Sequence, residues 1–205
     1  MARVSKVFEF ILPIKNTQYN IGNRYTAIKK YISDGDKGFK ISLINKESTN
    51  HDEYGRVEST IKHLHLHSKI PSMIKKLIPD AACTVTETSY YNEEIIFTSY
   101  KNNHFSNEVF SIKIETRISE ENPFPDVEKE TINIAGDEES IKCYKKMDVE
   151  VNNFFLGWIA NEISKSIKNQ IIDHHTLMIN TKDTWLNKSQ ADIDELEEET
   201  FNLNK

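Results

Sequence analysis

The stretch from Tyr54 to Pro71 restricts the fold more than any other, because it alternates like one long β-strand that ends at a proline. Successive side chains of a strand point to opposite faces. One face of this strand begins with the hydroxyl of Thr60 and the ammonium of Lys62, and it continues as leucine. Such a face predicts the wall of a cavity that has a polar mouth and an apolar interior.

The opposite face of the same strand carries a ladder of histidines, His63, His65 and His67. Neighbouring imidazoles of this kind are suitable ligands for a metal such as zinc. A catalytic zinc site also needs a further ligand, an open position and supporting partners, and no Asp, Glu or Cys stands at a suitable spacing. We therefore expect a half-solvated strand face and no metal site, and the metal site remains the alternative interpretation.

Length and composition predict a single soluble domain that spans residues 1–205. Hydrophobic residues make up 38% of the chain and charged residues 28%, which excludes a disordered or membrane-spanning protein. The formal charge of −6 gives no basic footprint for nucleic acid. It also argues against an anchor that binds membranes by charge alone.

The location of the protein is predicted from what its sequence lacks. The first residues do not have the apolar run and the cleavage site of a signal peptide, and no later segment has about twenty uninterrupted apolar residues. Cys83 and Cys143 are too few for a disulfide framework. We therefore expect a cytoplasmic protein with reduced cysteines.

Most of the chain has the period of β-strands, and its last third has the period of a helix. The expected strands are 7–12, 39–44, 82–89, 94–100, 108–117, 131–135 and 143–151. An early helix follows Thr17 as its N-cap and has Ile21, Tyr25, Ile28 and Ile32 as its apolar face, and a short helix is expected after Pro71.

Two helices are expected at the C-terminal end. Apolar residues recur at intervals of three and four from Phe155 to Met178, which predicts a long amphipathic helix laid over the sheet. Ser189 is the predicted N-cap of a short acidic helix, with Asp192 at the capping-box position. The fold class is therefore α+β, with a curved, mostly antiparallel sheet that grips a long C-terminal helix around a cavity.

Short motifs in the same order along the chain identify a family. They are Phe10 to Pro13, Tyr19 to Tyr25, Gly55 to Lys62, Ser68 to Pro71, Tyr91-Asn92, Ile112 to Thr116, Gly157 and Glu197 to Thr200. These motifs occur in the order, and at nearly the spacing, of one protein family, so the sequence resembles the phosphatidylinositol transfer proteins. The resemblance implies a fold related to START and helix-grip domains that encloses one phospholipid, with the lipid head group inside the protein.

The resemblance also implies which residues hold the lipid. Thr60, Lys62, Asn92 and Glu197 match the positions that bind the inositol ring, and their side chains supply both hydrogen-bond donors and acceptors for a polyol. Asn23, Ser99 and Thr116 match positions on the phosphate side, where the family uses an amide and hydroxyls.

Two departures from the family pattern bear on this site. The segment from Arg117 to Lys146 replaces a much longer one that carries a regulatory loop in the family. The lysine by which the family contacts phosphate falls at or beside Met147. Lys145 and Lys146 are candidates to replace it, but a shift of one residue in a strand reverses the face.

The family docks to membranes through a pair of tryptophans in a loop, and the corresponding residues here are Phe155 and Leu156, preceded by Phe154. We expect these three side chains to dock, whereas Trp158 belongs to the apolar face of the long helix. Burial of each such side chain contributes about 1.5–3 kcal/mol. A binding free energy contributed by only a few such side chains keeps the attachment reversible, as a carrier requires.

The resemblance implies a monomeric carrier without enzymatic activity that moves a single phosphatidylinositol, and also phosphatidylcholine, between membranes. It implies no cofactor beyond the bound lipid, no nucleic acid and a transient contact with the membrane surface. Three alternatives remain open at this point. They are a lipid sensor or scaffold that does not transfer, a member that prefers phosphatidic acid, and a metal-dependent helix-grip enzyme that uses His63, His65 and His67.

Overall fold

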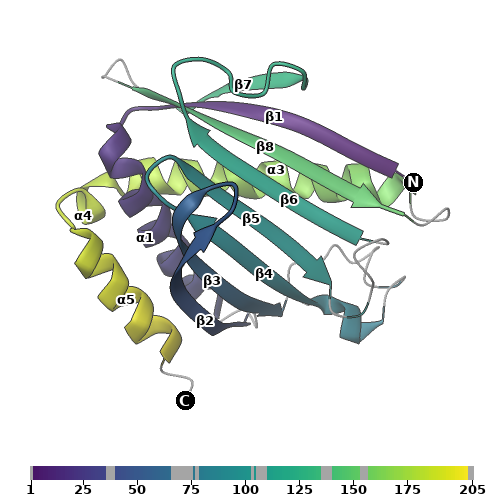
Figure 1. Ribbon diagram of the computed structural model, residues 1–205, viewed down its shortest axis with the longest axis horizontal. Coiled ribbons are helices and arrows are strands. Elements are labelled where there is room, and N and C mark those ends of the chain that lie inside the picture. Colours follow the sequence, from purple (N-terminus) through teal and green to yellow (C-terminus); the bar gives the residue numbers. More distant parts are fainter. Residues whose placement is uncertain are drawn as a thin grey trace.

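A single curved sheet with helices across one of its faces makes up the computed structural model (Figure 1). The described residues are 2–35, 40–65, 76, 79–102, 104, 110–134, 140–152 and 157–202. The strands are β1 (Ala2–Leu12), β2 (Lys40–His51), β3 (Gly55–His65), β4 (Thr84–Tyr91), β5 (Ile95–Asn102), β6 (Phe110–Ile118), β7 (Lys129–Asn133) and β8 (Ile141–Val151). The helices are α1 (Asn16–Gly35), η1 (Asp80–Cys83), α3 (Gly157–Asn180), α4 (Lys182–Trp185) and α5 (Gln190–Asn202), of which η1 is a short 3-10 helix.

The strands follow the order β2-β3-β4-β5-β6-β8-β1-β7 across the sheet. Strands β2 to β6 form a meander of antiparallel neighbours, and β8 pairs antiparallel with both β6 and β1. The edge strand β7 pairs parallel with β1. The predicted α+β class with a mostly antiparallel sheet and a long C-terminal helix is therefore confirmed.

Several predicted boundaries were wrong in detail. Helix α1 begins at Asn16, so Thr17 lies inside the helix and is not its N-cap. Ile32, expected on the apolar face of this helix, is 48% exposed. Helix α4 was not predicted at all, and the short helix expected after Pro71 lies almost wholly outside the described residues.

The N-cap of α5 was predicted correctly. The backbone nitrogen and the hydroxyl of Ser189 both donate to Asp192 Oδ2, at 2.6 and 2.7 Å. In return, the backbone nitrogen of Asp192 donates to Ser189 Oγ at 3.2 Å. This reciprocal pair satisfies groups that the first turn of a helix leaves without intrahelical partners, and it fixes where the acidic helix begins.

The hydrophobic core lies between the helices and the part of the sheet formed by β1 and β8. Alternate residues of β1, namely Phe8, Phe10 and Leu12, are almost fully buried. Phe10 packs on His175 of α3 with 4.3 Å between ring centroids. Full burial of each large apolar side chain contributes about 1.5–3 kcal/mol, so this region holds the long helix to the sheet.

The other face of β1 carries a buried carboxylate, Glu9, which is only 6% exposed. It accepts hydrogen bonds from Lys129 Nζ at 2.6 Å, Thr131 Oγ1 at 2.7 Å and the hydroxyl of Tyr144 at 2.8 Å. Burial alone would raise the pKa of Glu9, but these three donors lower that pKa to about 2. Glu9 thus joins β7 and β8 to β1 as a charged acceptor.

Substitution of Glu9 by glutamine is expected to lower the free energy of unfolding at pH 7 by about 2–3 kcal/mol, because the charged acceptor of three donors is lost. The folded pKa of about 2 lies below the ordinary value of 4.5. The contribution is therefore fully present above pH 4.5 and is lost as the pH falls from there toward 2. Urea unfolding of both proteins at pH 7 and pH 3 measures this loss.

The matched control for this substitution is Glu130→Gln, because Glu130 on β7 is half exposed and pairs with Lys168 at the surface. It is expected to change the stability by less than about 0.5 kcal/mol. Equal effects of the two substitutions, or a Glu9→Gln effect that does not shrink at low pH, would contradict the role given to Glu9.

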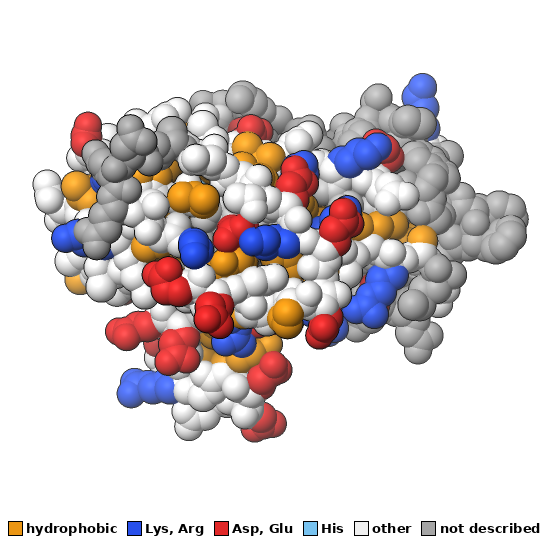
Figure 2. All heavy atoms as spheres, turned by 90° about the horizontal axis from the view of Figure 1, so that it is seen from above, with side chains coloured by type: hydrophobic (Ala, Val, Ile, Leu, Met, Phe, Trp, Pro, Cys, Tyr) orange, Lys and Arg blue, Asp and Glu red, His pale blue; other side chains and the backbone are white. Residues whose placement is uncertain are grey.

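The surface seen from above in Figure 2 mixes acidic and basic side chains in its described part, without a broad patch of either sign. Surface ion pairs of this kind include Lys6 with Glu128 at 2.7 Å. Among the described helices, none is both long enough and apolar enough to cross a membrane.

Candidate functional site

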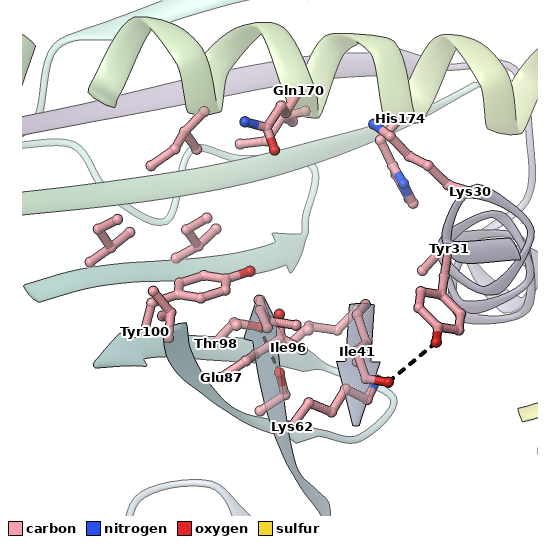
Figure 3. Close-up of a pocket in the computed structure, with 18 of the residues that line it drawn as sticks. Lys30, Tyr31, Ile41, Lys62, Glu87, Ile96, Thr98, Tyr100, Gln170 and His174 are labelled. Atoms are coloured by element: carbon pink, nitrogen blue, oxygen red, sulfur yellow. Dashed lines mark hydrogen bonds between the residues drawn. The ribbon is translucent and has the colours of Figure 1, made fainter. Parts of the chain in front are cut away.

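A cavity of about 880 Å³ lies between the sheet and the helices. Figure 3 shows its walls: Gln170 and His174 extend from α3, Lys30 and Tyr31 from α1, and Ile41, Lys62, Glu87, Ile96, Thr98 and Tyr100 from strands β2 to β5. Glu197 and Phe201 of α5 also line it. A cavity of this size falls within the range of sites that bind small molecules.

One region of the sheet wall is polar, as the strand register shows. Thr60 of β3 pairs with Ser89 of β4, which pairs with Thr98 of β5, and all three side chains line the cavity. The hydroxyls of Ser89 and Thr98 lie 3.1 Å apart. Thr116 of β6 and its register partner Lys145 of β8 add a hydroxyl and an ammonium in the next row toward the same end, where Ile114 is the register partner of Thr98.

The sheet wall becomes more apolar toward the other ends of the same strands. Leu64 of β3 pairs with Val85 of β4, and Phe110 of β6 pairs with Val151 of β8. All four line the cavity, together with Ile163 and Ile167 of α3. The wall therefore offers hydroxyls and ammonium groups at one end and hydrocarbon at the other, as an amphiphilic ligand requires.

A buried carboxylate and three cations form a first polar cluster at the charged end of the cavity. Glu197, Arg24 and Lys62 line the cavity, whereas Lys46 lies behind them and does not. Glu197 of α5 is 5% exposed. Its Oε2 receives Arg24 Nη2 at 2.6 Å and Lys46 Nζ at 3.1 Å, and its Oε1 lies 3.4 Å from Lys62 Nζ. Asp194, one turn earlier on α5, also pairs with Arg24 and Lys46, at 2.7 and 3.1 Å.

Glu197 is charged despite its burial. Burial alone would raise the pKa of this carboxyl, but Lys62, Arg24 and Lys46 hold it below its usual range. The same contacts fasten α5 to α1 and to β2 and β3. A carboxylate held in this way offers an acceptor beside the Thr60 hydroxyl and the Lys62 ammonium.

A second polar cluster is formed around Lys145, which is 8% exposed. Its Nζ donates to Thr116 Oγ1 at 2.9 Å. Burial lowers the pKa of Lys145, because an ammonium that has left water is less stable than one in solution. An anionic ligand oxygen beside Nζ would restore the lost stabilisation.

Asn23 and His174 meet across the gap between α1 and α3. His174 Nε2 and Asn23 Oδ1 lie 3.0 Å apart, and both residues line the cavity. Burial, followed by the charge of Lys145, lowers the pKa of His174 to about 3. The imidazole is therefore neutral at pH 7, and its N–H donates to the Asn23 oxygen, which leaves the Asn23 amide NH₂ as a donor at the cavity.

A family model described as "Phosphatidylinositol transfer protein" matches the chain over residues 3–133 and 124–202. This match covers nearly the whole chain. The chain belongs to the phosphatidylinositol transfer protein family.

Individual members of this family are similar at low identity. The human "Cytoplasmic phosphatidylinositol transfer protein 1" is 27% identical over 154 residues, which are 70% of this chain and 46% of the relative. The Dictyostelium discoideum "Phosphatidylinositol transfer protein 1" is 27% identical over 115 residues, 56% of this chain and 43% of that protein. The chain thus spans about half the length of the curated relatives that it matches.

A solved protein from Thermus thermophilus aligns with the fold at a TM-score of 0.33 and 10% identity, over 100% of this chain and 99% of that one. The family assignment does not depend on it.

Three of the four residues matched to the family's inositol positions come together. Thr60, Lys62 and Glu197 line the same end of the cavity. Asn92 does not line it, because its side chain stabilises the turn between β4 and β5. Its Oδ1 accepts from the backbone nitrogens of Glu94 and Ile95, at 2.9 and 3.0 Å, and its Nδ2 donates to the Tyr54 carbonyl at 3.1 Å.

The phosphate-side matches are brought together in part. Asn23 and Thr116 line the cavity, whereas Ser99 does not. Its neighbour Thr98 lines the cavity instead, because successive residues of a strand face opposite sides. Tyr91 and Thr98, which directly precede Asn92 and Ser99 in the sequence, therefore line the cavity in their place.

Of the two candidate lysines of β8, only Lys145 faces the cavity. Lys145 is two residues from the fully buried Met147, so both point to the same face, and Lys145 reaches the cavity. Lys146 points to the opposite face, where it lies 3.6 Å from Asp148.

Two groups of residues that were predicted from the sequence lie wholly or partly outside the described residues. Phe154, Phe155 and Leu156, the expected docking residues, lie outside the described residues. His67 also lies outside them, while His63 and His65 are on the face of β3 that turns away from the cavity. Within the described part of the chain, no cluster of three or more His, Cys, Asp or Glu residues is placed to hold a metal.

Sequence reasoning missed four residues of these polar clusters. Arg24 and His174 line the cavity, and Lys46 and Asp194 pair with the residues that do. Asp194 is three residues before the matched Glu197, so helical spacing places it near the site. Arg24 lies within the matched motif from Tyr19 to Tyr25, but consecutive helical residues do not share a face, so its neighbour Asn23 did not indicate its position. Lys46 and His174 gave no such signal, because their positions depend on how β2 and α3 pack against the other elements.

Proposed function

We propose that this chain binds one phosphatidylinositol molecule in the cavity and carries it between membranes. The observation that carries this proposal is the grading of one cavity wall from charged and hydroxyl groups to hydrocarbon. The inositol ring would meet Thr60, Lys62 and Glu197, and the phosphodiester would meet Lys145, Thr116 and Asn23. The acyl chains would lie along the apolar end formed by Leu64, Val85, Ile163 and Ile167.

The mechanism needs no covalent chemistry. Exposure of acyl chains to water costs about 0.8 kcal/mol for each CH₂ group, so a phospholipid leaves a bilayer slowly by itself. A protein that offers an equally apolar cavity at the membrane surface removes most of this barrier. Phosphatidylcholine would share the cavity, because the apolar contacts and the phosphodiester site do not distinguish head groups.

Movement of α5 would open the cavity to the membrane. Glu197 and Phe201 of this helix line the cavity, and its attachment depends partly on the ion pairs of Asp194 and Glu197. We propose further that residues 1–205 act as one monomeric domain without a cofactor. The word "cytoplasmic" in the names of relatives supports a cytoplasmic location with transient membrane contact.

Substitution of Lys62 by alanine tests the inositol site. It is expected to lower phosphatidylinositol transfer at least about tenfold, because a charge-assisted hydrogen bond to the ring is lost. Phosphatidylcholine transfer is expected to persist, since it does not use this contact. The measurement is the transfer of each labelled lipid between donor and acceptor vesicles.

Lys113→Ala is the control for this experiment, because Lys113 is exposed on β6 and faces away from the cavity. Transfer of both lipids is expected to remain unchanged in this variant. The assignment of the inositol site fails if Lys62→Ala affects the two lipids equally or affects neither.

A further inference from the structure

The ammonium of Lys145 is buried without a carboxylate to balance its charge. Lys145 is 8% exposed, and its Nζ donates to Thr116 Oγ1 at 2.9 Å. Among the described residues, no Asp or Glu forms an ion pair with it. Because a buried charge without such a partner is costly, another group is needed to hold this ammonium in place at the cavity wall.

The aromatic ring of Tyr19 on α1 supports this ammonium. Lys145 Nζ lies 5.8 Å from the centre of the ring, and Tyr19 is only 1% exposed. A cation over the face of an aromatic ring at this distance is attracted by the negative charge of that face, and the attraction is greater where water is excluded. Lys145 lines the cavity and Tyr19 does not, so the ring holds the ammonium from the protein side.

Contacts with two other elements fix the ring of Tyr19. Its hydroxyl lies 3.2 Å from Nε2 of the fully buried His175 on α3, and it also forms a hydrogen bond with the thiol of Cys143 on β8. His175 is in turn packed on Phe10, with 4.3 Å between ring centroids. A ring that a helix and a strand hold at its hydroxyl keeps its face toward Lys145, which is two residues beyond Cys143.

The hydrogen-bond donors of Lys145 show what this arrangement leaves for a ligand. An ammonium has three N–H donors. One is given to Thr116 Oγ1, and with Nζ over the Tyr19 ring a second points toward that ring. The third is left for an acceptor in the cavity, where the phosphodiester of the lipid is proposed to lie.

We propose that Tyr19 is a positioning residue of the lipid site, whose ring keeps the Lys145 ammonium charged and directed at the phosphodiester. Tyr19 would not touch the lipid itself. Loss of the ring would weaken the binding of phosphatidylinositol and phosphatidylcholine alike, since both have a phosphodiester. The inference rests on the proposed function, because it requires the phosphodiester to lie at Lys145.

The titratable groups around Lys145 differ from it in how they respond to pH. They are Cys143 on its own strand, Tyr19 on α1, and His174 and His175 on α3, with Lys30 of α1 beside His174 (Figure 3). Burial raises the pKa of Cys143 and Tyr19 and lowers the pKa of both histidines. Burial also lowers the pKa of Lys145. Lys145 is therefore the fully buried group of this cluster that loses a charge as the pH rises above 7.

Titration of the full chain, stripped of lipid, tests the effect of the ring on Lys145. NMR of protein with ¹³C-labelled lysine follows the charge of Lys145, whose signal is identified by its absence from Lys145→Met. Tyr19→Leu removes the ring and is expected to lower the pKa of Lys145 by about one unit. Tyr19→Phe loses the hydroxyl but keeps the ring, and it is expected to change this pKa by less than about 0.3 units.

Tyr25→Leu is the matched control, because Tyr25 is a buried tyrosine of the same helix whose ring lies near Lys29 and Lys188 instead, at 5.5 and 6.0 Å. It is expected to leave the pKa of Lys145 unchanged. If Tyr19→Leu does not fold, fluorinated phenylalanines at position 19 replace it, since fluorine withdraws negative charge from the ring face and nearly keeps the shape of the ring. The pKa of Lys145 is then expected to fall with each added fluorine. An unchanged pKa in Tyr19→Leu or across this series would overturn the inference.

Lipid loading tests what the ring does for the ligand. Each protein is incubated with vesicles of equal parts phosphatidylinositol and phosphatidylcholine, and native mass spectrometry gives the fraction of chains that carry each lipid. At pH 9, Tyr19→Leu is expected to bind both lipids up to about tenfold more weakly than the wild type, because less of its Lys145 is charged. This deficit is expected to shrink toward pH 6, where Lys145 is charged in both proteins. An equal deficit at both pH values would give Tyr19 a purely structural role and overturn the inference.

The remaining outcomes separate this inference from the function on which it rests. Normal loading of both lipids by Tyr19→Leu at pH 9 would overturn the inference and leave the carrier function intact. Loading of neither lipid by the wild type would overturn the carrier function. It would also overturn the role of Tyr19 at a phosphodiester, whatever the pKa of Lys145 does in the variants.

Discussion

Replacement of Lys145 by methionine is expected to weaken phospholipid binding about tenfold to a hundredfold without destabilising the protein. Lys145 is 8% exposed, and its ammonium has Thr116 Oγ1 at 2.9 Å. Burial lowers the pKa of Lys145, so the folded protein without lipid gains little from this charge. Methionine has a similar length and suits an irregular apolar site, and the free energy of unfolding is therefore expected to stay equal or to rise slightly.

Lipid loading responds differently, because every phospholipid has the phosphodiester that Lys145 would contact. Loss of a charge-assisted hydrogen bond in a buried site costs about 1.5–3 kcal/mol, or about tenfold to a hundredfold in affinity. Phosphatidylinositol and phosphatidylcholine should be affected alike, in contrast to the selective loss expected for Lys62→Ala. Vesicle transfer assays with each lipid measure both effects.

Lys146→Met provides a closely matched control. It removes the same charge from the same strand, but Lys146 faces the other side and pairs with Asp148 at 3.6 Å. Transfer by this variant is expected to remain normal. Equal losses in the two variants would mean that overall charge, and not a phosphate contact at Lys145, controls lipid binding.

Replacement of Trp185 by alanine is expected to have the largest effect on stability, about 3–5 kcal/mol. Trp185 of α4 is 0% exposed, and its Nε1 donates to the Met178 carbonyl at 2.9 Å. Its ring packs so closely on α1 that a Cβ at Gly22 would lie 2.8 Å from it. The indole therefore joins α1, α3 and α4, and its loss leaves a cavity where these helices meet.

Urea unfolding of Trp185→Ala measures this cost, and Leu177→Ala is the control because Leu177 is 37% exposed on α3. The control is expected to lose less than about 1 kcal/mol. A loss below about 1 kcal/mol for Trp185→Ala would show that the three helices do not depend on this side chain.

The wall that β3 contributes to the cavity could be predicted from the sequence, because the period of a strand fixes the face of each residue. Thr60, Lys62 and Leu64 share one face whatever the rest of the chain does, and all three line the cavity. The N-cap of α5 could also be predicted, because its hydrogen bonds join Ser189 and Asp192, which are only three residues apart in the sequence.

Other parts of the site depend on information that a pattern does not contain. Asn92 has the chemistry to bind inositol, yet the same chemistry stabilises a turn, and the hairpin geometry decides between these roles. A displacement of one residue placed Thr98 instead of Ser99 in the wall. The ion pairs of Lys46 with α5 join residues about 150 positions apart, and such tertiary contacts are not visible in local sequence.

Native mass spectrometry of the purified protein, followed by extraction and identification of the bound lipid, tests the carrier function most directly. We expect one phospholipid per chain, with phosphatidylinositol retained after exposure to mixed vesicles. A protein that stays free of phospholipid after this exposure, while it remains folded, would contradict the proposal that the cavity between the sheet and the helices holds a lipid.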